Sequence, residues 1–375
     1  MKIVVSIDSF KGSLSSLEAG NAVREAVKRL DDTAEVAVRP LADGGEGTVD
    51  ALASAMPSET VEISVKSPLL KETKAKYCIL NETKTAVIEM AAASGITLVS
   101  PEERNPLETT TYGVGELIKD AAKRGCRRFI VGIGGSATND GGAGMLSALG
   151  FEFLDASKKA ISLGAKGLKD LAEIKTDKVM PELRDCTFMV ACDVTNPLCG
   201  EKGCSAVFAP QKGADPEMIK DMDAWLKNYA VIAKTVSDRA DENLPGAGAA
   251  GGLGFAFSAF LNAELKSGIE IVLEETKLEE YIKDADIVVT GEGRLDSQTA
   301  NGKVPVGVAR IAKKYGAKVI AFAGGVTDDA GACNDEGIDA FFPIVRGVTT
   351  LDEAMDNFTA KKNMTLTAEQ VFRLL

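Results

Sequence analysis

Apolar strand-like runs alternate with amphipathic helical segments at both ends of this 375-residue chain. Near the start, Ile3-Val4-Val5-Ser6-Ile7 is typical of a buried strand, and Ser15-Ser16-Leu17-Glu18 is a capping box that opens a helix. The same rhythm returns beyond residue 284, with a strand at 287–289, a helix at about 304–315 and a strand at 318–322. Because strands joined by helices pair in parallel, the alternation predicts an α/β fold with a parallel sheet.

The middle of the chain follows a different pattern. Between residues 60 and 90, two or three strand-like runs are separated only by short turns, which leave no room for crossover helices. Strands spaced so closely pair antiparallel. Helix and strand then alternate again, and Asp215-Pro216-Glu217 opens a helix with cap and first-turn chemistry. The middle segment therefore predicts an α/β domain with a mixed sheet.

Two domains are expected for a chain of this length, because one hydrophobic core usually stops growing at about 250–300 residues. The two ends share a pattern that the middle lacks. We therefore predict a discontinuous Rossmann-like parallel-sheet domain, residues 1–62 and 271–375, with a mixed-sheet α/β domain, residues 63–270, inserted into it. An active cleft between the two domains is expected, because ligand pockets favour domain interfaces.

The composition excludes several classes of function. A formal net charge of −12 argues against nucleic acid and anionic membranes as partners, since both select for basic surfaces. The chain has no histidine, so a Ser-His-Asp triad and a histidine-ligated metal are impossible. Seven cysteines without a CxxC pair indicate reduced thiols, and no secretion signal precedes the first strand, so we expect a cytoplasmic location.

Four predicted strands end at or just before a polar loop, at residues 8–13, 134–140, 193–196 and 291–296. In open α/β sheets, ligands bind beyond the carboxyl ends of the strands, and helix N-termini favour anions. The first two loops combine glycines with hydroxyl groups, and the first also carries Lys11. They are therefore candidate sites for a phosphate or a carboxylate, with helix capping and tight packing as the alternative.

Other residues suit a metal or a further anion contact. Asp193, Glu292 and Asp296 offer the hard oxygen ligands that Mg²⁺ prefers, although each can instead cap a helix or a turn. Lys303 opens a predicted helix and can contact a phosphate, but the next residue is valine, so the Walker motif fails. Residues 43–48 are a further candidate anion-binding turn.

Eight strings of sequence follow one another along the chain: residues 8–14, 40–48, 109–118, 133–142, 192–198, 209–214, 245–252 and 290–298. In content and order they resemble the type I glycerate kinase family. The resemblance implies ATP- and Mg²⁺-dependent phosphorylation of D-glycerate to 2-phosphoglycerate or, as in some members, 3-phosphoglycerate, in glycerate, glyoxylate or sugar-acid catabolism. It also implies two α/β domains, one of them flavodoxin-like and discontinuous, facing each other across the active cleft in a monomer or homodimer.

The roles of individual residues are hypotheses built on this resemblance. Phosphoryl transfer needs positioning, charge neutralisation and one group to orient the attacking hydroxyl. Lys11 and Arg294 are predicted to neutralise the glycerate carboxylate or the transferring phosphoryl group. Either Asp193 or Asp8 is predicted to be the base. The predicted catalytic residues are therefore Asp8, Lys11, Asp193 and Arg294. The predicted ATP-binding residues are Ser13, Gly134, Gly135, Ser136, Thr138, Asn139, Lys212 and Lys303. The predicted substrate-binding residues are Asp43, Gly45, Glu46, Asn196 and Gln298, and the predicted Mg²⁺ ligands are Asp193, Glu292 and Asp296.

Two other interpretations stay open on the residues alone. Residues 132–137 match the dinucleotide-binding pattern G-x-G-x-x-A after a strand, with Glu152 and Asp155 roughly where a ribose ligand falls. A dehydrogenase is therefore one alternative. The other is a two-domain binding protein without catalysis, which predicts ligand affinity but no ATP turnover.

Overall fold

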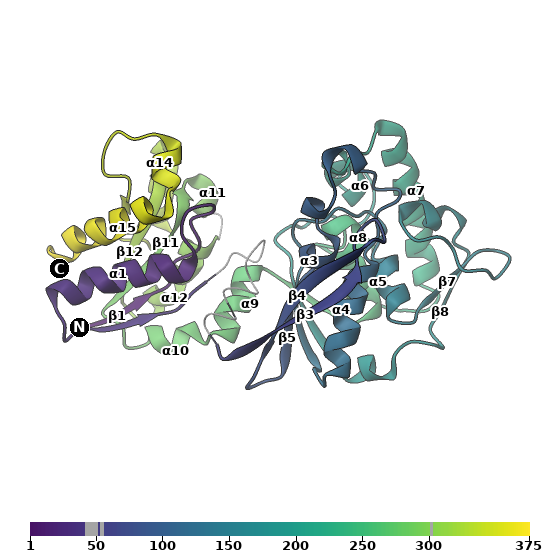
Figure 1. Ribbon diagram of the computed structural model, residues 1–375, viewed down its shortest axis with the longest axis horizontal. Helices are drawn as coiled ribbons and strands as arrows, with labels where there is room; N and C mark the ends of the chain where they lie inside the picture. The colour runs from purple at the N-terminus through teal and green to yellow at the C-terminus, as the bar shows by residue number, and fades with distance from the viewer. Residues whose placement is uncertain (42–51, 53–55, 301–302) are drawn as a thin grey trace. The chain divides into compact units, whose positions relative to one another are not determined.

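The computed structural model describes residues 1–41, 52, 56–300 and 303–375. The chain forms two compact units (Figure 1): the first holds Ile269–Leu375 and the described residues up to Met56, and the second holds Pro57–Gly268. Within the described ranges, no helix is both long enough and apolar enough to cross a membrane. Three predicted substrate-binding residues, Asp43, Gly45 and Glu46, lie outside the described residues.

The first unit is built on a five-stranded parallel sheet. Its strands are β1 (Lys2–Val5), β2 (Glu35–Val38), β11 (Ile287–Leu295), β12 (Lys318–Val326) and β13 (Ala340–Pro343). They lie in the order β2-β1-β11-β12-β13, and every neighbouring pair is parallel. Counted within the unit this order is 2-1-3-4-5, the flavodoxin-like order. The second strand is added on one side of β1 and the later strands on the other, so the switch point of the sheet lies between β1 and β11. The predicted flavodoxin-like parallel sheet is confirmed.

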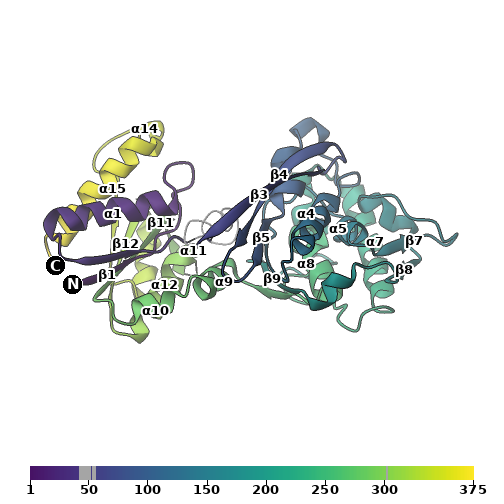
Figure 2. The same cartoon turned by 60° about the horizontal axis from the view of Figure 1, so that its bottom comes forward.

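Helices cover both faces of this sheet. Helices α1 (Ser16–Leu30) and α15 (Asn357–Phe372) lie on one face, and α12 (Val304–Lys314) and α10 (Leu278–Ile282) lie on the other (Figure 2). The predicted capping box at the start of α1 is present, with Ser15 and Glu18 each accepting from the other's backbone amide. Shorter helices complete the unit: α9 (Gly268–Glu275), α11 (Ser297–Ala300), α13 (Ala332–Asp335) and α14 (Leu351–Met355).

Strand β11 is longer than the sequence predicts. The expected polar loop at 291–296 is mostly a continuation of this strand, in which Glu292 and Arg294 pair with residues of β12. Glycines make this possible: a Cβ atom on Gly324 of β12 would lie only 2.6 Å from the carbonyl oxygen of Gly293. The prediction of a loop was therefore wrong, and the charged side chains of this segment project from a hydrogen-bonded strand.

The second unit contains a six-stranded mixed sheet. Its strands are β3 (Ser58–Lys66), β4 (Glu72–Leu80), β5 (Thr85–Glu89), β6 (Arg128–Gly132), β9 (Thr187–Ala191) and β10 (Glu264–Lys266). Their order is β10-β9-β6-β5-β4-β3. The pairs β3–β4 and β4–β5 are antiparallel and the remaining pairs are parallel, which confirms the predicted mixed sheet. Strands β7 (Glu152–Leu154) and β8 (Glu173–Lys175) form a separate antiparallel pair.

The helices of the second unit are α3 (Ala91–Ser94), α4 (Tyr112–Lys123), α5 (Ala143–Ala148), α6 (Cys204–Phe208), α7 (Pro216–Ala233) and α8 (Ala249–Phe260). Asp215 caps α7 as predicted, since its carboxylate accepts from the amide of Met218 at 2.8 Å. The start of α8 is irregular, with left-handed backbone from Ala250 to residue 252. A Cβ atom on Gly251 would lie 2.1 Å from the carbonyl oxygen of Thr138, so the glycine-rich start of α8 packs directly against the loop after β6.

Candidate functional site

A pocket lies at the carboxyl ends of the parallel strands in each unit. The switch-point pocket of the first unit measures about 510 Å³ and is lined by the loop after β1, the end of β11, Lys303, two glycines of β12 and parts of the segment 344–363. The glycine-loop pocket of the second unit measures about 390 Å³ and is lined by the loops after β6 and β9, by η5 (Pro210–Lys212) and by the start of α8. The four predicted loops are thus brought together in two pairs.

The turn after β1 presents a lysine and a serine to the switch-point pocket. Asp8 is buried at the end of the strand, where its amide donates to the carbonyl of Gly291 on the neighbouring strand at 2.9 Å. The chain then turns tightly at Gly12, whose φ of 78° favours glycine. Lys11 and Ser13 both line the pocket, and the buried Ser13 hydroxyl has no hydrogen-bond partner among the described residues. A bound ligand can satisfy such a group.

Two carboxylates and an arginine from the end of β11 face the same pocket. Glu292 Oε1 accepts a hydrogen bond from Thr299 Oγ1 at 2.6 Å. Asp296 Oδ1 accepts from the amides of Gln298 at 3.0 Å and Thr299 at 3.2 Å, so this side chain caps the short helix α11. Arg294 is exposed, and its Nε lies 3.7 Å from Asp296 Oδ2. The lining of the pocket therefore carries both signs of charge.

The three predicted Mg²⁺ ligands are divided between the pockets. Glu292 and Asp296 line the switch-point pocket, whereas Asp193 lines the glycine-loop pocket. Among the residues that the structure describes, no cluster of three or more acidic or cysteine side chains could hold a metal alone. Mg²⁺ is usually held by one or two carboxylates together with phosphate oxygens and water, so the pair in the switch-point pocket fits this ion when a phosphorylated ligand is present.

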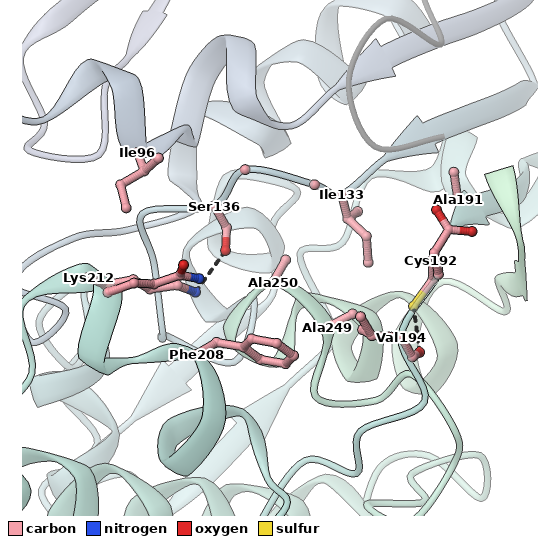
Figure 3. Close-up of a pocket in the computed structure, with 14 residues that line it drawn as sticks. Ile96, Ile133, Ser136, Ala191, Cys192, Val194, Phe208, Lys212, Ala249 and Ala250 are labelled. Atoms are coloured by element: carbon pink, nitrogen blue, oxygen red, sulfur yellow. Dashed lines mark hydrogen bonds between the residues drawn. The ribbon is translucent and has the colours of Figure 1, made fainter. Parts of the chain in front are cut away.

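The glycine-loop pocket contains a buried cation (Figure 3). Lys212 is only 2% exposed, and its ammonium donates to Ser136 Oγ and to the carbonyl of Thr138, both at 2.7 Å. An ammonium has three N–H donors, and the third finds no acceptor in the described part of the chain. Burial lowers the pKa of Lys212 to about 8. A buried cation without a paired carboxylate is costly unless a ligand supplies the negative charge.

Backbone amides of the loop after β6 accompany this cation. Gly135 has a φ of 69°, and its carbonyl accepts from the amide of Ile96 at 2.8 Å, which anchors the loop. The amides of Gly134, Gly135 and Ser136 meet no acceptor within the described residues. Successive amides around a left-handed residue form a nest that binds anions. Together with Lys212, they make this end of the pocket an anion site.

Residues farther along the same loop hold its shape. Asp140 is fully buried, and its carboxylate accepts from the amides of Thr111 at 2.9 Å and Gly144 at 3.2 Å. Burial raises the pKa of Asp140, and hydrogen bonds from Thr111, Thr110 and the amide of Gly142 oppose the rise. Asn139 donates to Ser205 Oγ at 2.9 Å and is not among the residues that line the pocket. Contact between Asn139 and a ligand stays a prediction.

The remaining wall of the glycine-loop pocket is apolar. Ile96, Ile133, Phe208, Ala249 and Ala250 surround the space beside Lys212 (Figure 3). Sequence analysis missed these residues, because apolar side chains in helical or strand-like context are indistinguishable from core. The available signal was that Ile133, Ala249 and Ala250 lie within the strings at 133–142 and 245–252, and that Phe208 directly precedes the string at 209–214. A pocket with an apolar wall and an anion site suits a ligand that has a flat apolar part and an anionic part.

Three other predicted site residues are Asp193, Asn196 and Gln298, and the first two make hydrogen bonds to the backbone. Asp193 lines the glycine-loop pocket and accepts from the amide of Gly268 at 3.1 Å. Asn196 donates to the carbonyl of Lys202 at 2.8 Å, and Gln298 is exposed on α11. Neither Asn196 nor Gln298 belongs to the lining of the two pockets, and their contact with a substrate stays a prediction.

The two acidic residues predicted to contact the ribose of a dinucleotide lie away from the glycine-loop pocket. Glu152 lies on β7 and pairs with Lys178 at 2.7 Å. Asp155 accepts from the amides of Ser157 and Lys159 in a surface turn. Neither acid lines the glycine-loop pocket, so the ribose contact expected of a dehydrogenase has no counterpart there.

Comparisons with known proteins agree on one family. A family model described as the glycerate kinase family matches residues 3–375. The chain is 48% identical to the glycerate kinase of Haemophilus influenzae, covering 100% of this chain and 99% of that protein. It is 49% identical to the glycerate 2-kinase of Escherichia coli K12, covering 94% and 93%. The crystal structure of a Salmonella typhimurium LT2 protein assigned as glycerate kinase 2 superposes with a TM-score of 0.91 at 47% identity, covering 99% and 97%.

Proposed function

The chain belongs to the glycerate kinase family, and from this premise we propose that it transfers the γ-phosphoryl group of ATP to the 2-hydroxyl of D-glycerate. The product is 2-phosphoglycerate, as the name of the Escherichia coli relative suggests. The observation that carries the nucleotide part of the proposal is the buried Lys212 ammonium beside a nest of loop amides. We place the reaction in the cytoplasm, in glycerate, glyoxylate or sugar-acid catabolism, with a monomer or homodimer as the active form.

The nucleotide is assigned to the glycine-loop pocket. Its apolar wall, which includes Phe208 and Ile133, can take the adenine base, and the anion site formed by Lys212 and the loop amides lies in the same pocket. Lys212 and the amides of Gly134 and Gly135 would contact phosphate oxygens. The third N–H of the ammonium would then gain an acceptor, and the phosphate charge would compensate the cost of burying the lysine.

Glycerate is assigned to the switch-point pocket. Lys11 and Arg294 supply positive charge for the carboxylate of glycerate or for the transferring phosphoryl group. Glu292 and Asp296 would hold Mg²⁺, which neutralises phosphate charge when it is bound. The switch in strand order between β1 and β11, beside this pocket, supports the assignment, because open α/β sheets bind ligands at such points.

The base is assigned to Asp8. Without histidine, a carboxylate is the natural acceptor for the proton of the attacking hydroxyl. Asp8 lines the same pocket as Lys11, whereas Asp193 lines the glycine-loop pocket. Asp8 is also 4% exposed, and burial keeps such a carboxylate away from competing water.

The direct test is ³¹P NMR of the products formed from ATP, Mg²⁺ and D-glycerate. A phosphoglycerate signal is expected, and its chemical shift and coupling distinguish the 2-phosphate from the 3-phosphate. L-glycerate and a reaction without enzyme serve as controls. ATP binding without any phosphoglycerate would support the noncatalytic alternative and overturn the proposal, and a 3-phosphate would overturn the assignment of the acceptor hydroxyl.

A further inference from the structure

Thr299 connects three residues that line the switch-point pocket, although it was not among the predicted site residues. Its hydroxyl donates to Glu292 Oε1 at 2.6 Å and accepts from the amide of Asp296 at 3.3 Å. Its own amide donates to Asp296 Oδ1 at 3.2 Å, and its carbonyl accepts from the amide of Lys303 at 3.3 Å. Thr299 in α11 therefore contacts both carboxylates and the backbone of Lys303.

Burial makes this arrangement specific. Thr299 is completely buried, so its hydroxyl does not exchange these partners for water. A hydroxyl has one hydrogen to donate, and here that hydrogen is given to Glu292. A short bond between a hydroxyl and a carboxylate is stronger than one between neutral groups. The side chain thus fixes one carboxylate oxygen of Glu292.

Fixing the carboxylate matters for metal binding. A free glutamate side chain loses about 1.5–2 kcal/mol of rotamer entropy when a ligand immobilises it, and a neighbour that holds it in place beforehand removes part of that cost. Groups that orient metal-ligating carboxylates through hydrogen bonds typically change metal affinity by about 10–100-fold when they are removed. Asp296 is held in the same way, because two amides of α11 already occupy its Oδ1.

We propose that Thr299 is a positioning residue that pre-orients Glu292 and Asp296 for a divalent metal. This inference rests on the proposed function, which places Mg²⁺ at these two carboxylates. Thr299 itself does not line the pocket. It acts on Glu292 through its hydroxyl and on the carboxylate of Asp296 through its backbone amide, so a substitution of Thr299 tests the contact with Glu292.

The test compares two nearly matched substitutions by the affinity for Mn²⁺, measured by electron paramagnetic resonance in the presence of ATP and without turnover. Thr299→Val keeps the shape but removes the hydroxyl, and we expect a 10–100-fold weaker affinity. Thr299→Ser keeps the hydroxyl but removes the buried methyl group, and we expect an affinity within about threefold of wild type. The Mg²⁺ concentration for half-maximal activity should follow the same ranking.

Three controls separate positioning from packing. Thr276→Val removes another buried hydroxyl, which donates to the carbonyl of Val272 in α9, and should leave Mn²⁺ affinity unchanged. In a Glu292→Ala background, Thr299→Val should weaken Mn²⁺ binding much less than in wild type, because the carboxylate that the hydroxyl orients is already gone. If Thr299→Val does not fold, as judged by circular dichroism, Thr299→Ala replaces it with the same expected ranking.

The outcomes are decisive. Equal Mn²⁺ affinity for the valine variant and wild type, or equal weakening by serine and valine, would refute the positioning role and leave Thr299 as a packing residue. Failure of the proposed function looks different, because the wild-type protein would then form no phosphoglycerate whatever the behaviour of Thr299. A ranking in which only loss of the hydroxyl weakens metal binding supports the inference.

Discussion

Replacing Lys212 with methionine distinguishes the effect of the buried charge on folding stability from its effect on ATP binding. Methionine has a similar length and no charge, so it fills the same space in the glycine-loop pocket. The proposal that Lys212 binds phosphate predicts that the variant folds normally but binds ATP weakly. A structural role for the two hydrogen bonds of the ammonium predicts the opposite, namely a loss of stability.

The magnitudes follow from the surroundings of the side chain. Burial lowers the pKa of Lys212 from 10.5 to about 8, which at about 1.4 kcal/mol per unit corresponds to roughly 3 kcal/mol of cost for the charged form. Methionine removes that cost. It also leaves the Ser136 hydroxyl and the Thr138 carbonyl without their partner, at about 1–3 kcal/mol. The two effects nearly cancel, so the free energy of unfolding should change by less than about 2 kcal/mol.

For ATP binding, no gain opposes the loss of the Lys212 ammonium. A hydrogen bond from a charged donor contributes about 1.5–3 kcal/mol, so kcat/KM for ATP should fall by roughly 10–150-fold. Steady-state kinetics and urea unfolding measure the two quantities on the same sample. Lys220→Met, on an exposed position of α7, is the matched control and should change neither. The reasoning is refuted if Lys212→Met keeps kcat/KM for ATP within threefold of wild type, or if it lowers the unfolding free energy by more than about 4 kcal/mol.

Three further predictions concern the same two pockets and their scaffold. Lys11→Ala should lower kcat/KM for glycerate by about 100-fold in initial-rate assays. The change should appear as a higher KM if Lys11 binds the carboxylate, and as a lower kcat if Lys11 binds the phosphoryl group. A wild-type kcat/KM would contradict the assignment of Lys11. Because the pKa of Lys212 is lowered to about 8, its positive charge is lost as pH rises through that value. We therefore expect kcat/KM for ATP to decline above pH 8, towards tenfold per pH unit. A flat profile from pH 7 to 9.5 would contradict a role for the charge of Lys212 in ATP binding. Gly251→Ala places a methyl group 2.1 Å from the Thr138 carbonyl at a φ of 67° and should destabilise the protein by more than about 3 kcal/mol in urea unfolding. Gly316→Ala, at a φ of 74° with nothing within 4 Å, should cost only about 1 kcal/mol, and equal effects of the two would contradict the clash.

Local patterns in the sequence were sufficient for much of the fold. The capping box at Ser15 and the cap at Asp215 start their helices where expected, because a cap depends on side chains within three residues of it. Short turns between residues 60 and 90 forced antiparallel pairing for the same local reason. The pattern failed at residues 291–296, where polar side chains suggested a loop but glycine pairing with β12 extended the strand.

The candidate site was only partly accessible from sequence. The order of the glycine-rich strings identified the family and the four loops, because those residues are contiguous in the chain. Phe208 and Thr299 were missed, since an aromatic residue and a threonine within short helices have no local feature that distinguishes them from core or surface. Their roles depend on neighbours that other elements bring to them.

The sequence by itself determined most of the strands and helices, that no histidine takes part in catalysis, and which family the chain belongs to. Only the tertiary structure decided which loops meet. The strand order places β1 beside β11, so that Asp8 hydrogen-bonds a residue more than 280 positions away. It also buries Lys212 against Ser136, 76 residues earlier. Periodicity reports the burial of a residue within its own element, whereas the charge, partners and pKa of a side chain depend on which other elements pack around it.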